Sequence, residues 1–196
     1  MAVVDAPLFS FAASGQLGKA LVFFPWKGLK CVRSYVHPAN PETSDQEAQR
    51  TKLHTAVNFW HTTGLDAADI TAWNALAAIM EKAQSGFNAF VAAVIAILKA
   101  GGDTDMPYDG SIATGGAGTF TAICKDKLGK ATSGFVDWGY SPTAMLTSTA
   151  LAEAPASTWT AAAVAATTGA WVYGRFRLIA AAKTVGNSGI FKFKVV

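Results

Sequence analysis

Two histidines and two aspartates in the first half of the chain have the residue types of a metal site. His54 and His61 are seven positions apart in a segment with helical periodicity, so they fall on roughly the same helix face. A metal ion would need further ligands, and Asp66 and Asp69 are the nearest candidates. Both aspartates stand at the start of the next expected helix, where carboxylates cap free backbone N–H groups. We interpret them as helix caps and predict no metal-binding residues.

A second group of candidate residues lies between residues 103 and 118. Asp103, Asp105 and Asp109 could hold a cation, but the later glutamate of an EF-hand loop is missing. The glycines of 115–118 open no helix, so they do not form a phosphate-binding loop. The chain also has no nucleophile elbow and no paired acid motif. The sequence therefore predicts a protein that is not an enzyme, with no catalytic residue and no cofactor.

The two cysteines, Cys31 and Cys124, are too few for a disulfide framework or a zinc site. Both lie in apolar runs that resemble strands. We therefore expect two buried free thiols.

The composition is poor in charge. Of the 196 residues 51% are hydrophobic and 15% are charged, with a net charge of +3. Soluble domains usually carry more surface charge, so we expect other subunits to cover part of this surface.

No block of Lys and Arg is dense enough for a nucleic-acid-binding arm, and no apolar run reaches the roughly 18 residues that span a membrane. Residues 1–5 lack the features of a signal peptide, so we expect synthesis in a cytoplasm and no membrane or nucleic-acid partner.

Residues 14–36 have the pattern of a β-hairpin. Two strands, over 20–24 and 29–36, are separated by a turn at Pro25–Gly28, and residues 5–13 could form a further short strand that pairs with them or reaches a neighbouring subunit. Neither face of the second strand is purely polar, so it needs cover on both sides or a partner chain along its edge. The candidate interface residues are large apolar side chains and one cation: Phe9, Phe11, Leu21, Phe23, Trp26, Arg33 and Tyr35.

A stiff connector and three helices follow the hairpin. The prolines of 37–41 restrict the backbone, and Ser44 with Glu47 matches a capping box. Apolar residues at helical spacing predict helices over 45–63, 66–83 and 87–99. The third is the most apolar, so it should lie at the centre of the helical layer.

Residues 103–118 lack periodicity and are predicted to form a linker. From residue 119 onward the hydrophobic period is two, and about six strands separated by turn residues predict an antiparallel, immunoglobulin-like β-sandwich with Trp138 in its core. The expected fold class is α+β. Its parts are a β-hairpin and three-helix domain over 1–102, the linker over 103–118 and the sandwich over 119–196.

The N-terminal half resembles a group of uncharacterised proteins encoded by tailed phages and prophages. The shared pattern covers a Ser-Gly-x-x-Gly start, a strand, a connector and a helix start. It falls on Ser14, Gly15, Gly18, Gly28, Val32, Arg33, Ser34, Tyr35, Pro38, Asn40, Pro41, Thr43, Gln46, Gln49 and Arg50. This resemblance implies a role in the virion or in its assembly. The alternation over 171–180 is similar to the last strands of immunoglobulin-like or fibronectin-type modules.

We therefore expect a structural protein located in a tailed-phage virion, most simply a capsid decoration, cement or minor head protein. Its partners would be copies of itself or other virion proteins in a homo-oligomer or symmetric assembly. One alternative is a subunit of a tail tube or extracellular filament. Another is a carbohydrate-binding or adhesion module in which an exposed Trp159 or Trp171 provides a stacking surface.

Overall fold

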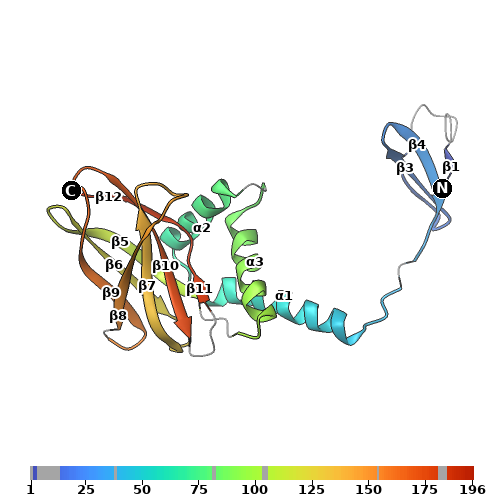
Figure 1. Cartoon of the computed structure of the whole chain (residues 1–196). Helices are drawn as coiled ribbons and strands as arrows, with labels where there is room; N and C mark the ends of the chain where they lie inside the picture. Colours follow the sequence, from blue (N-terminus) through green and yellow to red (C-terminus); the bar gives the residue numbers. More distant parts are fainter. Residues whose placement is uncertain are drawn as a thin grey trace. The chain divides into compact units, whose positions relative to one another are not determined.

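The computed structural model describes residues 2–3, 14–37, 39–80, 83–102, 106–153, 155–180 and 185–196. The chain forms two compact units, Met1–Thr43 and Ser44–Val196 (Figure 1). The first unit is a small antiparallel sheet. The second unit combines three helices with a larger antiparallel sheet. The predicted α+β class is confirmed.

The first unit contains four short strands, in the order β1-β4-β3-β2. They are β1 (Ala2–Val3), β2 (Gly15–Leu17), β3 (Leu21–Trp26) and β4 (Leu29–Ser34). The predicted hairpin is thus confirmed as β3 and β4. Its turn is tighter than predicted, because Trp26 pairs with Leu29 and only Lys27 and Gly28 lie between them. Both turn residues have positive φ, 48° and 81°, as a two-residue type I′ turn requires.

Two sequence predictions for this region fall partly or wholly outside the described residues. The short strand expected over 5–13 lies there, as does Pro38 of the connector. The described part of the connector, up to residue 43, is neither helix nor strand.

The second unit contains an eight-stranded antiparallel sheet in the described part of the chain. Its order is β11-β10-β7-β8-β9-β6-β5, and β12 also pairs with β10. The strands are β5 (Pro107–Gly116), β6 (Thr119–Asp126), β7 (Ala131–Gly139), β8 (Thr147–Glu153), β9 (Thr158–Ala165), β10 (Trp171–Ala180), β11 (Val185–Asn187) and β12 (Phe191–Lys194).

The sheet folds over so that its two ends face each other. Strand β5 lies against β10 and β12. A Cβ atom on Gly110 of β5 would come within 3.0 Å of the Phe191 ring on β12, and one on Gly174 of β10 would come equally close to Ile112 of β5. These glycines are therefore needed where two strands approach across the core.

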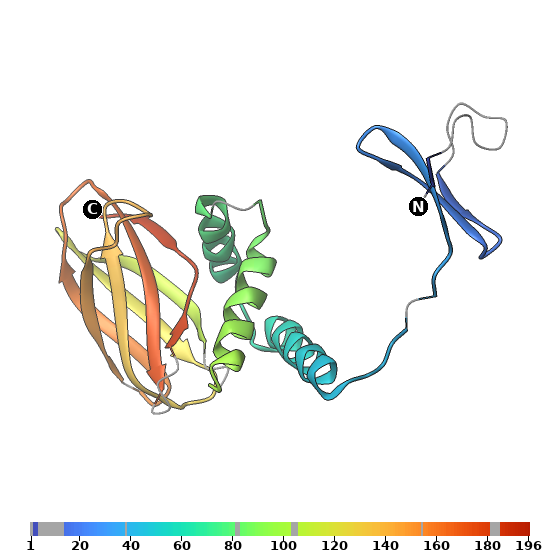
Figure 2. The ribbon, with the colours of Figure 1, turned by 45° about the vertical axis from the view of Figure 1, so that its right-hand side comes forward.

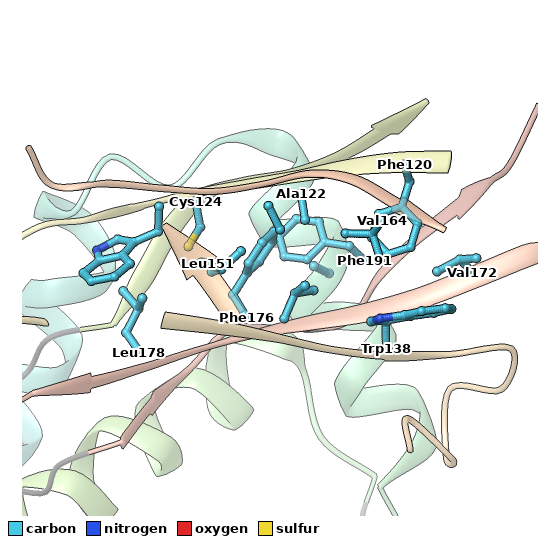
Figure 3. Close-up of a cluster of buried hydrophobic side chains, with 14 of the residues drawn as sticks. Phe120, Ala122, Cys124, Trp138, Leu151, Val164, Val172, Phe176, Leu178 and Phe191 are labelled. Carbon is cyan, nitrogen blue, oxygen red and sulfur yellow. The ribbon is translucent and has the colours of Figure 1, made fainter. Parts of the chain in front are cut away.

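The space between the two ends is filled by apolar side chains. Phe120, Trp138 and Phe176 are buried in one cluster, and the Phe120 and Trp138 rings meet edge to face at 5.2 Å. Figure 3 shows side chains of β6 and β9 facing those of β7 and β10. The predictions of a core Trp138 and of buried free thiols at Cys31 and Cys124 are confirmed. Burial raises the pKa of Cys124, and nearby carboxylates raise it further to a smaller extent.

Strand β10 follows its predicted alternation. Every second residue from Val172 to Ala180 is buried, while the alternate residues from Trp171 to Ile179 are exposed or half-buried. The buried residues are thus those of one face of the alternation over 171–180.

The helices are α1 (Ser44–Thr62), α2 (Ala67–Ile79) and α3 (Gly86–Lys99). As predicted, α3 lies at the centre of the helical layer, in contact with both α1 and α2 (Figure 2). The buried rings of Trp73 and Phe90 meet edge to face at 5.2 Å in this second core. Helix α2 is shorter than the predicted 66–83. Two apolar residues within that predicted range, Ile70 and Met80, are exposed.

The domain division differs from the predicted one. The helices form a unit with the large sheet, since α2 lies against β5 and β12, and Ala72 belongs to the core of the sheet. The Ile190 amide donates a hydrogen bond of 2.9 Å to the Ala72 carbonyl. The linker predicted over 103–118 is wrong for 107–116, which form β5. The glycines of this segment removed the hydrophobic alternation from which a strand is recognised.

This division leads to a testable prediction about fragments. A fragment of residues 44–196 should unfold in one cooperative transition, because it contains both cores and the contacts that join them. A fragment of residues 110–196 should not, because it lacks α2 and part of β5. Circular dichroism during thermal melting would distinguish the two. A cooperative β-type melt of the shorter fragment would show that the sheet does not depend on the helices.

Candidate interaction site

The sheet of the first unit exposes large apolar side chains. Among the described residues of this unit, the buried apolar side chains are Phe23 and Cys31. The exposed ones are more numerous: Leu17, Leu21, Trp26, Leu29 and Val36. An apolar surface of this kind on a small sheet is typical of a protein–protein contact.

The most exposed ring of this sheet lies at the end of the β3–β4 hairpin. Trp26 and Leu29 are direct cross-strand neighbours and are 53% and 52% exposed. We call residues 26–29 the hairpin tip. Its type I′ turn fixes the backbone between these two side chains, so they form one apolar surface without further ordering.

Arg33 lies on β4, and its described contact is with an aromatic ring. Its guanidinium carbon lies 5.6 Å from the centroid of the Phe24 ring, a cation–π contact between neighbouring strands. The side chain of Arg33 is exposed, so it is available at the surface of the sheet.

The remaining candidate interface residues separate into three groups. Leu21 is exposed near the other end of β3, as expected. Phe23 is 9% exposed and belongs to the interior of the sheet, and Tyr35 is half-buried with its amide bonded to the Ala20 carbonyl at 2.8 Å. Phe9 and Phe11 lie outside the described residues. Leu29 was not among the candidates, although its place beside the turn was visible in the sequence.

The aspartates that first suggested a metal site cap α2, as predicted. The Asp69 amide donates to the Asp66 carboxylate at 2.7 Å, and the Asp66 amide donates to the Asp69 carboxylate at 3.4 Å. His54 and His61 are exposed on α1. Within the described ranges, no three His, Cys, Asp or Glu side chains are grouped so as to hold a metal ion.

Asp69 also has a role that the sequence did not reveal. Its buried carboxylate accepts hydrogen bonds from the backbone amides of Asp109, at 2.7 Å, and Gly110, at 3.1 Å, at the start of β5. Burial raises the pKa of Asp69, and the backbone donors offset this only in part. Asp69 therefore joins the first turn of α2 to the large sheet.

Lys125 and Arg177 of the large sheet each form an ion pair with an aspartate. Lys125 pairs with Asp109 at 2.6 Å. Arg177 donates two hydrogen bonds to Asp137, at 2.8 and 3.0 Å. Burial acts to raise the pKa of Asp137, but the hydrogen bonds from Arg177 and Ser148 and the nearby positive charges outweigh it, and the pKa is lowered.

The two tryptophans proposed as stacking surfaces differ in exposure. Trp159 is 4% exposed and lies in the core of the large sheet, so the proposal of an exposed Trp159 is wrong. Side chains alternate between the two faces of β9, and Trp159 lies on the face that is buried. Trp171 is 49% exposed at the start of β10.

Comparisons with known proteins give no relative. No protein-family model, no curated protein and no solved structure matches this chain. Among the described helices, none is both long and apolar enough to cross a membrane.

Proposed function

We propose that this chain is a non-enzymatic structural protein of a tailed-phage virion, most simply a capsid decoration, cement or minor head protein. Its partners are copies of itself or other proteins of the particle. The observation that carries this proposal is the exposed apolar surface of the N-terminal sheet, with Trp26 and Leu29 at its hairpin tip. The sequence pattern that resembles proteins of tailed phages covers the same segment.

The arrangement of the chain fits such a role. The chain divides into two compact units at the boundary between Thr43 and Ser44, and the N-terminal sheet belongs to the first. A unit of about 40 residues buries little apolar surface by itself. Contact with a neighbouring subunit would supply the burial that the N-terminal sheet lacks, and the second unit would remain folded before and after assembly.

The strand order supports the proposal that the large sheet is an immunoglobulin-like sandwich. Strands β5, β6 and β9 are neighbours at one end of the path. At the other end are β7, β10 and the short strands β11 and β12, which pair with successive parts of β10 and together take the place of a seventh strand. In immunoglobulin-like domains the first, second and fifth strands share one sheet, and the third, sixth and seventh share the other. Strand β8 pairs with both β7 and β9, so it connects the two groups.

The edge of the N-terminal sheet favours a second candidate, a subunit of a tail tube or filament. Strand β2 is the last strand of the β1-β4-β3-β2 order, and its three residues are exposed. An edge of this kind can pair with a strand of the next subunit through backbone hydrogen bonds. Electron microscopy of the assembled protein would separate the two readings, since a head protein gives shell density and a tube protein gives a filament.

The assembly role predicts a specific effect of the hairpin tip. The double variant Trp26→Ser, Leu29→Ser should melt within about 4 °C of the parent, because both side chains are exposed and each surface substitution usually changes stability by less than about 0.5 kcal/mol. It should lose self-association, or binding to phage heads that lack the protein, in analytical sedimentation. Leu53→Ser is a matched control, because this exposed leucine lies on α1.

Two results would contradict the assembly role. One is a parent protein that stays monomeric at high concentration and binds no particle. The other is a double variant that assembles like the parent.

A further inference from the structure

A shallow hollow of about 490 Å³ lies on the second unit, away from the hairpin tip in sequence. It is formed by the residue after β7, by the loop between β9 and β10 and by the start of β10. Its lining combines aromatic rings with a hydroxyl and a methyl group: Tyr140, Thr167, Ala170, Trp171 and Tyr173. Tyr140 and Trp171 are 51% and 49% exposed, so large parts of two aromatic side chains are open to solvent.

Contacts with neighbouring parts of the second unit fix the walls of the hollow. The Tyr140 ring lies edge to face on the buried Trp138 ring at 6.0 Å, and its hydroxyl accepts a 3.0 Å hydrogen bond from the Thr167 amide. The loop between β9 and β10 is tied to the end of the chain, because Gly169 donates to the Val195 carbonyl at 2.9 Å and the Val195 amide donates to Ala170 at 3.0 Å. A ligand would therefore meet a surface that is already ordered.

The hydroxyl groups at the rim retain hydrogen-bonding capacity. The Tyr140 and Thr167 hydroxyl oxygens are 3.0 Å apart, and either can be the donor. Each hydroxyl has one proton, so only one of the two protons is used between them. Whichever group donates, the other hydroxyl proton remains for a bound molecule.

Two lysines give the same surface a positive charge. The Lys192 ammonium lies 4.3 Å from the Trp171 ring centroid and 5.7 Å from that of Tyr173. Lys194 is the direct cross-strand partner of Trp171. An anionic group of a ligand that lies on the Trp171 side chain would thus be close to two cations.

We propose that this hollow binds a pyranose unit of a glycan that carries a carboxylate. A pyranose has a face of C–H groups that packs on aromatic rings and hydroxyls around its edge that need donors and acceptors. The hollow offers both kinds of group side by side, and its volume is in the range of small-molecule sites. The lysines select a carboxylated sugar over a neutral one. This inference is independent of the assembly proposed for the N-terminal sheet.

Saturation-transfer NMR on the full chain tests the inference with sialyllactose as the ligand and lactose as its neutral counterpart. An array of glycans that contain uronic or sialic acid is a broader probe. We expect binding of carboxylated glycans and at least threefold weaker binding of their neutral counterparts. Trp171→Ala should reduce the binding at least tenfold. Trp171→Tyr, which keeps an aromatic ring, should retain part of it, and Lys192→Gln should remove most of the preference for the carboxylate. Trp26→Ala, in the other unit, should bind like the parent.

Thermal melting of each variant checks that its fold is intact. Absence of binding to any glycan by a folded parent would overturn the inference. So would equal binding by folded Trp171→Ala. Glycan binding that persists when Trp26 and Leu29 are replaced would support the glycan-binding inference even if the virion role failed.

Discussion

Asp69→Ala is expected to lower the free energy of unfolding by roughly 3 kcal/mol, as measured by urea denaturation. The carboxylate accepts hydrogen bonds from three backbone amides, those of Asp66, Asp109 and Gly110. Alanine leaves the two amides of β5 without this acceptor, and of these two residues Gly110 is buried and Asp109 is half-buried. Each unsatisfied buried donor costs about 1–3 kcal/mol. Relief from burying the Asp69 charge offsets part of the loss, because burial already raises the pKa of this group.

Asp66→Ala is the matched control for this prediction. Asp66 belongs to the same capping box, but its described hydrogen bonds stay within the first turn of α2. Loss of a cap costs about 1 kcal/mol. The difference between the two variants therefore measures the connection from α2 to β5. If the two losses were equal within error, the hydrogen bonds that Asp69 accepts from the amides of β5 would contribute nothing to stability.

Local patterns in the sequence predicted the elements of this protein better than their packing. Period-two alternation separated the two faces of β10, and the turn residues around Gly28 identified the hairpin. Helical spacing located α1 and α3 to within about one residue. These signals depend on neighbours in sequence, so they do not need the fold to be known.

The division into units was not predictable in the same way. It depends on which apolar faces meet, and α2 has an apolar residue on nearly every side. Its contacts with the large sheet involve the small residue Ala72 and the polar residue Asp69, neither of which marks a core in a sequence. Residues that look like a helix cap can thus also bind a strand 40 positions later.

The candidate interaction site was predicted in part for a similar reason. Phe23 and Phe24 are adjacent and equally apolar, so the sequence did not show which one lies inside. The structure buries Phe23 and places Phe24 beside Arg33. Trp26, a candidate interface residue at the predicted turn, is exposed. The hollow at Trp171 needed Tyr140 and Thr167, which are 27 positions apart and meet only in the folded sheet.

Gly189→Ala is expected to cause a loss of about 3 kcal/mol or more in the free energy of unfolding. A Cβ atom at Gly189 would lie within 3.0 Å of backbone atoms of Ala72 and Trp73 in α2. Backbone atoms inside a helix have no alternative rotamer, so the helix and the start of β12 would have to separate. Separation would also break the hydrogen bond from the Ile190 amide to the Ala72 carbonyl.

Gly101→Ala separates this packing effect from backbone strain. Gly101 has a φ of 79° and no atom within 4 Å of its added Cβ, so its substitution should cost only the roughly 1–2 kcal/mol of a left-handed backbone. Gly189→Ala should exceed that loss in urea denaturation. It should also speed hydrogen exchange at the Ile190 amide by at least tenfold, which strain at Gly101 would not do. A smaller loss than that of Gly101→Ala, with unchanged exchange at Ile190, would mean that α2 and β12 can separate without cost. The single unit from Ser44 to Val196 would then not depend on this contact.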